Sequence, residues 1–260
     1  MSVDALLERS LWDLFWLPPW AEVVDRPELL YTRSDQDQIV LNQLMRVRAE
    51  PSRVPALVAE LDAAHARVRS RAMLCPGSQS AALDRELTRG GWQIEALHHG
   101  FVARPDPARW VTRAGVEVRP VRDAATLRDA IHVSGAAFGR EREQVSEQRV
   151  RDELAQCAVP GARVQRFVAY DAVTQEPLSA GGLNLFPALG LAFLWGGGTV
   201  PGGRGRGAYS AVVAARLKRA AEAGCALVGV YAREGTSAPI VARQGFEQHG
   251  PMITWTRERP

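Results

Sequence analysis

The sequence has little cysteine and no long hydrophobic run, and each lack excludes a class of protein. Its three cysteines, Cys75, Cys157 and Cys225, are far apart and form no C-x-x-C pair, so we expect reduced core residues and no metal site. No apolar stretch approaches the roughly 20 residues that span a bilayer, and no basic-then-apolar leader with a small-residue cleavage site opens the chain. We therefore expect a soluble, cytoplasmic protein that does not enter a membrane.

The charge balance is nearly even. The 260 residues carry a net charge of +3, which comes almost entirely from arginine against acids. This mild basic excess suits an anionic cofactor and is too small to indicate a nucleic-acid partner. With 46% hydrophobic residues, the chain can bury an ample core as one large domain or two small ones.

The most informative stretch is a motif rich in glycine and arginine between a strand and a helix. Residues 191–195 are typical of a buried strand, and residues 208–223 of an alanine-rich helix that Gly224 ends. Between them lies Arg204-Gly205-Arg206-Gly207. Bare amides at the start of a helix bind anions, so we expect a phosphate or pyrophosphate there, with the two arginines as mobile cations.

The motif differs from two other phosphate-binding loops. No Lys-Ser or Lys-Thr pair follows its last glycine, and it is not a full dinucleotide fingerprint, so nucleoside triphosphates and NAD are disfavoured. Taken alone, the loop could also be a flexible turn before a core helix, or an arginine–glycine tract that touches RNA.

Several linked motifs across residues 199–246 resemble the GNAT acyltransferase family in order and spacing. They are Thr199-Val200-Pro201, the loop from Arg204, Gly224-Cys225 after the helix, Ser237-Ala238-Pro239-Ile240 and Gln244-Gly245-Phe246. The resemblance implies that the Arg-x-x-Gly-x-Gly/Ala loop holds the pyrophosphate of acetyl-coenzyme A. It also implies that the preceding strand pairs with the pantetheine arm.

The coenzyme-binding residues that the resemblance implies cluster around this loop. They are Thr199, Val200, Arg204, Gly205, Arg206, Gly207, Ala208, Tyr209, Ser210 and Ser237. Tyr209 departs from the pattern, because the family has Gly or Ala at that position. A tyrosine ring that points away from the ligand would leave its N–H available.

The fold implied is α/β, a mixed and mostly antiparallel sheet flanked by helices, with residues 113–260 as the catalytic domain. The patterns place its remaining elements as strands at 116–119, 163–171 and 178–186 and helices at 124–138 and 146–155. Residues 105–115 are the expected linker.

Residues 1–112 are predicted to be a degenerate, partial copy of the same fold. The order strand, Pro51, helix, strand, helix, Gly91 recurs as strand, Pro201, helix, strand, helix, Gly245. The loop after Pro51 has no glycine, and Pro55 removes an N–H donor, so this copy should not bind coenzyme. Its elements are expected as a helical clamp within residues 1–20, strands at 29–31 and 39–47, a helix at 54–68, a strand at 72–75, a helix at 80–88 and strands over 92–103.

The catalytic side chains that many relatives carry are missing. The tyrosine that protonates the thiolate in such relatives corresponds to Val241, and a glutamate base to Gly229. Tyr231 lies two residues after Gly229, hence on the same strand face, and is the best substitute, although a structural role is at least as plausible. The resemblance also implies that this strand separates from the next one and leaves an N–H facing the thioester. Glycines at residues 196–198 would allow the β-bulge that this needs, with the carbonyl near Thr199.

Other polar residues have weaker claims. Ser237 either touches coenzyme or caps a helix, His132 is expected to be packed, and His98-His99 lacks further metal ligands. Glu141 or Glu147 could meet a cationic amine, because the same segment shapes the acceptor pocket in relatives.

The sequence therefore predicts an N-acetyltransferase that moves an acetyl group from acetyl-CoA to a small-molecule or peptide amine by direct attack in a ternary complex. The alternative is a non-catalytic acyl-CoA sensor or scaffold, favoured by Val241 and the missing base. Aminoacyl transfer from tRNA is a third possibility, but it needs a broad basic groove that this charge balance does not suggest.

Overall fold

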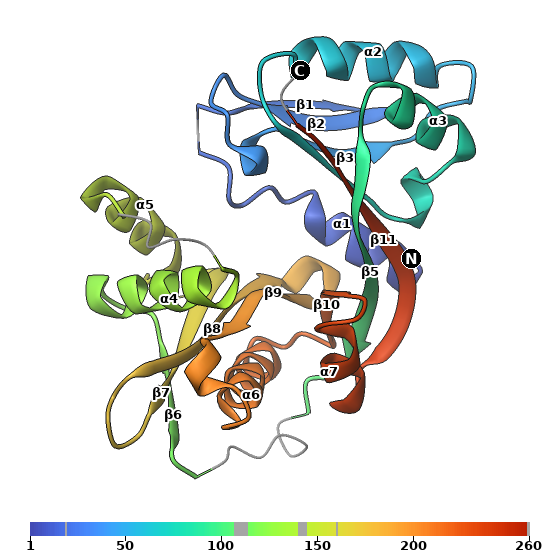
Figure 1. The fold of residues 1–260 in the computed structure, drawn as a ribbon. Helices are drawn as coiled ribbons and strands as arrows, with labels where there is room; N and C mark the ends of the chain where they lie inside the picture. Colours follow the sequence, from blue (N-terminus) through green and yellow to red (C-terminus); the bar gives the residue numbers. More distant parts are fainter. Residues whose placement is uncertain (19, 107–113, 140–144, 160, 259–260) are drawn as a thin grey trace. The chain divides into compact units, whose positions relative to one another are not determined.

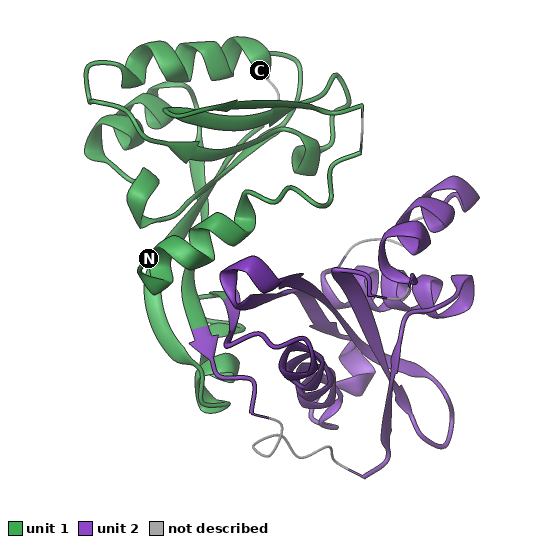
Figure 2. Ribbon diagram, turned by 180° about the vertical axis from the view of Figure 1, so that it is seen from behind, with its two compact units in different colours: residues 1–101, 231–260 green, residues 102–230 purple. Residues whose placement is uncertain are grey.

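The computed structural model describes residues 1–260 apart from 19, 107–113, 140–144, 160 and 259–260 (Figure 1). The chain forms two compact units (Figure 2). Unit 1 comprises Met1–Phe101 and Tyr231–Pro260, and unit 2 comprises Val102–Val230. Among the helices of the described residues, none is long and apolar enough to cross a membrane.

Unit 2 is a sheet in the order β10-β9-β8-β7-β6, antiparallel except for the parallel pair β9/β10. Its strands are β6 (Val116–Pro120), β7 (Val164–Asp171), β8 (Pro177–Phe186), β9 (Leu191–Thr199) and the first part of β10 (Leu227–Arg233). Its helices are α4 (Ala124–Ala137), α5 (Glu147–Cys157) and α6 (Ala208–Glu222).

Helices α4 and α6 cover opposite faces of this sheet. Side chains of successive strand residues point to opposite faces. A Cβ built at Gly197 would meet Tyr209 of α6, at 3.1 Å, whereas one at Gly198 would meet Ala137 of α4, at 2.6 Å. The two glycines thus allow both helices to approach β9 closely.

Local sequence explains where these helices begin. Asp123 and Thr126 form a reciprocal capping box that starts α4, in which the Thr126 N–H donates to the Asp123 carboxylate at 2.8 Å. Helix α6 instead begins after Gly207, whose backbone is left-handed (φ 82°) and offers no side chain as a cap. Its first amides are therefore left for something other than a protein side chain.

Unit 1 repeats part of this topology. Its sheet order is β1-β2-β3-β4-β11-β5, and β3 and β4 are parallel, as β9 and β10 are. The strands are β1 (Glu22–Arg26), β2 (Leu29–Arg33), β3 (Gln43–Val47), β4 (Ser70–Leu74), β5 (Gln93–Ala103) and β11 (Glu247–Arg257). The helices are α1 (Val3–Leu11), α2 (Val54–Ala64), α3 (Ala81–Arg89) and α7 (Ala238–Arg243). Leucines of α2 and α3 pack with Trp255 of β11 in one core.

The last strand of the chain pairs within the first repeat. β11 runs antiparallel to β4, with Ile253 opposite Leu74 and Arg257 opposite Ser70. β5, which follows α3 in the first repeat, lies on the other side of β11. Contacts therefore group Tyr231–Pro260 with the first hundred residues, which differs from the predicted division at 112/113.

One element prediction was wrong, and one strand was not predicted. Residues 39–47 are not one strand, because Ile39–Leu41 form a 3-10 turn before β3. Asn42 holds that turn, since its side chain accepts from the Ser34 N–H and donates to two carbonyls. Strand β1 was not predicted, and it forms an exposed hairpin with β2.

Candidate functional site

The glycine-rich loop lies between β9 and α6, as predicted. Residues Pro201–Gly203 form one 3-10 turn, and Gly205 and Gly207 then adopt left-handed backbones with φ of 75° and 82°. No atom lies within 4 Å of a Cβ built at Gly205, so the loop is open there. Left-handed residues in a turn can direct neighbouring N–H groups toward one side and so form an anion-binding concavity.

The amides of this loop have few partners. The N–H groups of Gly203 and Arg204 donate back to Val200 and Pro201, which closes the 3-10 turn. For the amides of residues 205–209, the part of the chain that the structure describes offers no acceptor. A helix start of this kind carries about half a positive charge, so it favours an anion.

The two arginines of the loop have different surroundings. Arg204 is exposed and has no ion-pair partner among the described residues. The Arg206 guanidinium instead pairs with Asp171 at the end of β7, so Arg206 is not the mobile cation predicted from the sequence. The Asp171 carboxylate also accepts the N–H groups of Thr174 and Val173, and these bonds with the ion pair lower its pKa to about 2.

The ring of Tyr209 lies against β9. Its Cε2 is 3.1 Å from a Cβ built at Gly197, and its hydroxyl hydrogen-bonds the side chain of Arg216, two turns further along α6. Arg216 is 1% exposed, and burial lowers its pKa to about 10. The Tyr209 side chain thus points to the sheet, which agrees with the predicted availability of its N–H.

Strands β9 and β10 separate beside the loop. Their parallel pairing covers Leu191 to Phe193 and ends where Phe193 lies opposite Gly229. β9 continues to Thr199 without a partner in β10. The sequence predicted this opening only through the family resemblance.

The predicted bulge in β9 is present. Opposite β8, Ala180 pairs with Gly198 but Gly182 pairs with Trp195, so β9 carries one extra residue in between. Gly196 takes up the distortion with a left-handed backbone, φ 58°.

Near Thr199, the edge of β9 that faces away from β8 is not paired with β10, so its backbone can pair with a ligand. The Val200 N–H donates to Leu178 of β8 at 2.9 Å. Because N–H groups alternate between the two edges of a strand, the N–H of Thr199 faces the other edge, where pairing with β10 has ended. This N–H is a backbone donor at the position where the thioester carbonyl was expected.

Tyr231, the predicted catalytic residue, belongs to unit 1 and is half-buried beside Cys75. Its hydroxyl lies 3.0 Å from the Cys75 sulfur. Burial raises the pKa of Tyr231 and raises that of the Cys75 thiol to about 12. These surroundings favour a packing role, and the catalytic assignment stays a prediction. All three cysteines are buried and free, as expected.

Ser237 is the N-cap residue of α7, as expected, but its side chain makes no cap bond to the helix. Its Oγ accepts the N–H of Arg233 at 2.9 Å. The coenzyme contact stays a prediction. Val241, at the position of the usual tyrosine, is buried in α7.

The candidates for acceptor binding and metal binding gain little from the structure. Glu147 forms an ion pair with Arg128 at 2.6 Å, whereas Glu141 lies outside the described residues. His99 lies 3.2 Å from Glu234. In the ranges that the structure describes, no group of three or more His, Cys, Asp or Glu residues could hold a metal.

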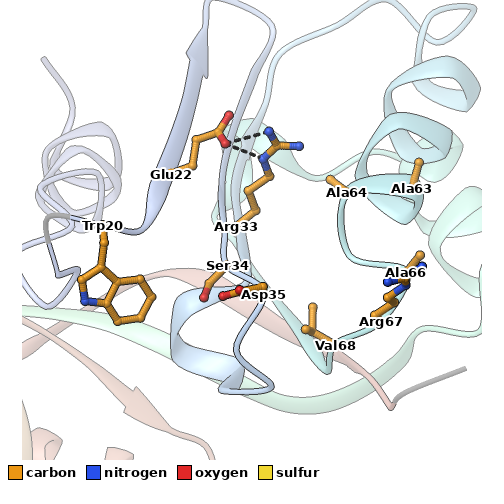
Figure 3. Close-up of a pocket in the computed structure, with 10 residues that line it drawn as sticks. All are labelled: Trp20, Glu22, Arg33, Ser34, Asp35, Ala63, Ala64, Ala66, Arg67 and Val68. Carbon is orange, nitrogen blue, oxygen red and sulfur yellow. Dashed lines mark hydrogen bonds and ion pairs between the residues drawn. The ribbon is translucent and has the colours of Figure 1, made fainter.

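A cavity of about 500 Å³ opens in unit 1, and none of the predicted site residues lines it (Figure 3). Glu22 and Arg33 face each other across an ion pair at its edge. The other lining residues are Trp20, Ser34, Asp35, Ala63, Ala64, Ala66, Arg67 and Val68. Its two arginines are balanced by two acids, so it has no net attraction for the phosphates of a coenzyme.

Two residues that shape the loop were missed by sequence reasoning. Asp171 fixes Arg206, and Arg216 holds Tyr209. The sequence carried one signal for Arg216: it is a charged residue on the apolar side of an alanine-rich helix, four residues after Val212, which is fully buried.

Solved structures of acetyltransferases resemble the whole chain. A GCN5-related N-acetyltransferase from Kribbella flavida matches with a TM-score of 0.70 and 17% identity, over 99% of this chain and 96% of its own. One from Sphaerobacter thermophilus matches at 0.67 and 16%, over 97% and 86%. A tandem GNAT protein from the clavulanic acid biosynthesis pathway matches at 0.62 and 15%, over 96% and 87%. No protein-family model and no curated protein sequence matches the chain.

Proposed function

We propose that this chain, which has the two-part fold of the tandem GNAT proteins, is an N-acetyltransferase that uses acetyl-CoA as its acyl donor. The acceptor is a primary amine of a small molecule or peptide. The acetyl group passes by direct attack of the amine on the thioester in a ternary complex.

The observation that carries this proposal is the set of amides at the start of α6. Five consecutive N–H groups, those of residues 205–209, have no acceptor among the described residues, and two left-handed glycines turn them outward. A diphosphate offers several anionic oxygens to such a set, and each charge-assisted hydrogen bond contributes roughly 1.5–3 kcal/mol. Arg204 adds a cation at the same loop.

The open edge of β9 supports the assignment of the acyl end. From Leu194 to Thr199 this strand has no partner in β10, so an extended pantetheine arm can add to it as a strand would. The Thr199 N–H then donates to the thioester oxygen as negative charge develops on it. Holding the amine beside the thioester supplies much of the remaining rate enhancement.

Two measurements on the full-length protein test this function. Calorimetry with acetyl-CoA measures binding, and a thiol-reactive dye measures release of free coenzyme A with a panel of amines. We expect binding together with amine-dependent thiol release. Absence of binding would refute the assignment of the loop.

A non-catalytic acyl-CoA sensor is the second candidate. It is favoured by Val241 in place of the usual acid and by the hydrogen bond between the Tyr231 hydroxyl and the Cys75 thiol. A sensor binds acetyl-CoA with the same loop but releases no thiol with any amine, so the second measurement separates the two.

A further inference from the structure

The four tyrosines of the chain differ in what their hydroxyl groups contact. Tyr31 donates to the Glu60 carboxylate at 3.2 Å, and Tyr170 donates to Asp129 at 2.8 Å. Tyr231 shares its hydrogen bond with the buried Cys75 thiol. The pKa of each of these three is raised, first of all by burial. None of them is suited to give up a proton.

Tyr209 differs from these three in its surroundings, because the side chain beside its hydroxyl is a cation. A guanidinium can only donate, so the Tyr209 oxygen accepts from Arg216 and its own proton points elsewhere. Within the described ranges that proton has no acceptor. Tyr209 as a whole is half-buried, unlike Tyr31 and Tyr170, which are buried.

Arg216 is a buried cation, and its described hydrogen-bond partners include no carboxylate. Its Nη1 donates to the Gly182 carbonyl at 3.1 Å and its Nε to the Val212 carbonyl at 3.2 Å. No acidic partner occurs among the residues whose placement is described. Buried charges are usually paired, so an unpaired one is expected to serve a negative charge that appears during function.

Glycines of two strands make room for this pair at the β9 bulge. A Cβ at Gly181 would lie 2.8 Å from Arg216 Cζ, and one at Gly197 would lie 3.6 Å from the Tyr209 hydroxyl. Gly197 is part of the bulge, two residues before the Thr199 N–H. The phenol and its cation thus lie next to the strand segment assigned to the thioester.

We propose that Tyr209, held by Arg216, is the residue that gives a proton to the departing coenzyme thiolate, an inference that rests on the proposed function. The amine nitrogen forms the new C–N bond, and the C–S bond breaks with its electron pair on sulfur. The thiolate takes the Tyr209 proton. The phenolate left behind is stabilised by Arg216 and recovers, through solvent, the proton that the amine nitrogen loses.

This assignment explains the departure at position 209. Where relatives of the resembled family have Gly or Ala in the loop and a tyrosine on the following helix, this chain has Tyr209 and Val241. The acid has changed its position on the fold, while the backbone N–H of residue 209 stays available to phosphate. Arg216 is a positioning residue in this scheme, because it acts through Tyr209.

The test uses the full chain with Tyr209→Phe and, as a matched control, Tyr170→Phe. Both variants lose one hydroxyl in unit 2, but the Tyr170 hydroxyl donates to Asp129 and its ring packs in the core and under the Arg119 guanidinium. General acids contribute about a hundredfold or more, so we expect kcat of Tyr209→Phe to fall by about that factor while its Kd for acetyl-CoA stays within about twofold. Tyr170→Phe should keep the wild-type kcat.

Arg216 variants provide a second measurement. Arg216→Lys keeps the charge and should retain more of kcat than Arg216→Met, which keeps a similar volume without charge. The Kd for acetyl-CoA should be similar in both, because the effect is on the chemical step.

The outcomes separate the two levels of inference. If wild type turns over and Tyr209→Phe keeps its kcat, or loses only affinity, the proton-donor role is refuted and the transferase stands. If Tyr209→Phe does not fold, equal kcat in the two Arg216 variants refutes the role. If wild type binds acetyl-CoA but releases no thiol with any amine, the transferase and the role of Tyr209 both fail.

Discussion

The chain contains two helices that each follow a strand of a parallel pair, and only one of them starts with an open set of amides. Helix α6 begins after left-handed Gly207, with no side chain as a cap. Helix α2 begins after Arg53 in a right-handed conformation, and Pro55 removes one of its first N–H groups. The same topology therefore supports either a closed or an open helix start, and a few loop residues decide which.

The surrounding charges reinforce this difference. Arg53 of the first loop pairs with Glu28 at 3.2 Å, whereas Arg204 of the second has no described partner. The first repeat thus uses its loop to hold structure together, and the second leaves its loop for a ligand. Three predictions test this contrast.

The largest expected effect is a loss of stability at low pH, and it comes from the C-terminal end of α2, which differs from that of α6. Helix α2 ends at His65, which is buried and lies 2.8 Å from the Thr32 carbonyl, whereas α6 ends before Gly224. Burial lowers the pKa of His65 from 6.5 to about 4. The folded protein therefore resists a proton that the unfolded chain accepts, so stability is full above pH 6.5 and is lost as the pH falls toward 4.

The expected loss of unfolding free energy over that range is about 3 kcal/mol, from the size of the pKa shift. His65→Gln keeps a donor for Thr32 but does not titrate, so its stability should stay flat over the same range. Urea unfolding at several pH values measures both proteins. Parallel pH profiles for wild type and variant would contradict the assignment to His65.

The second prediction places a negative charge at each end of α6. Gly207→Asp puts a carboxylate among the open amides and should raise the Kd for acetyl-CoA by about tenfold or more. Gly224→Asp is the control, since Gly224 has a similar backbone (φ 74°) at the far end of the helix. Ser52→Asp makes the same change in the first loop. Calorimetry should show wild-type affinity for both controls, and equal losses in all three would contradict the contrast.

The smallest effect distinguishes the two arginines of the second loop. Arg204 is free to meet a phosphate, whereas Arg206 is held by Asp171. Arg204→Ala should therefore weaken acetyl-CoA binding by about fivefold, near 1 kcal/mol, and Arg206→Ala by less. A larger loss with Arg206→Ala would mean that Asp171 positions that arginine for the ligand.

The local patterns of this sequence predict most elements but not all of their partners. The strand, loop and helix around Gly207 followed from periodicity and glycine spacing. The bulge at residues 196–198 followed from the family resemblance, with the glycines there allowing it. The position of β11 between β4 and β5 did not follow from local patterns. Both are eleven-residue strands after a short helix and a Gly-aromatic pair, so nothing local indicates which of them lies beside β4.

The candidate site likewise has a part that the sequence predicts and a part that it does not. Backbone donors could be predicted, because glycine positions determine where amides are bare. The pairs Arg206–Asp171 and Tyr209–Arg216 could not, since each depends on where a long side chain ends after folding. Residues 39–41 show the same limit, because the side chain of Asn42 overrides an apolar run that is typical of a strand.

The pairing of β11 with β4 also bears on the order of events during synthesis. The sheet of the first hundred residues lacks one of its inner strands until residues 247–257 have emerged from the ribosome. Until then β4 presents an unpaired edge to other nascent chains. Maturation of unit 1 is thereby coupled to translation of the segment that carries the glycine-rich loop.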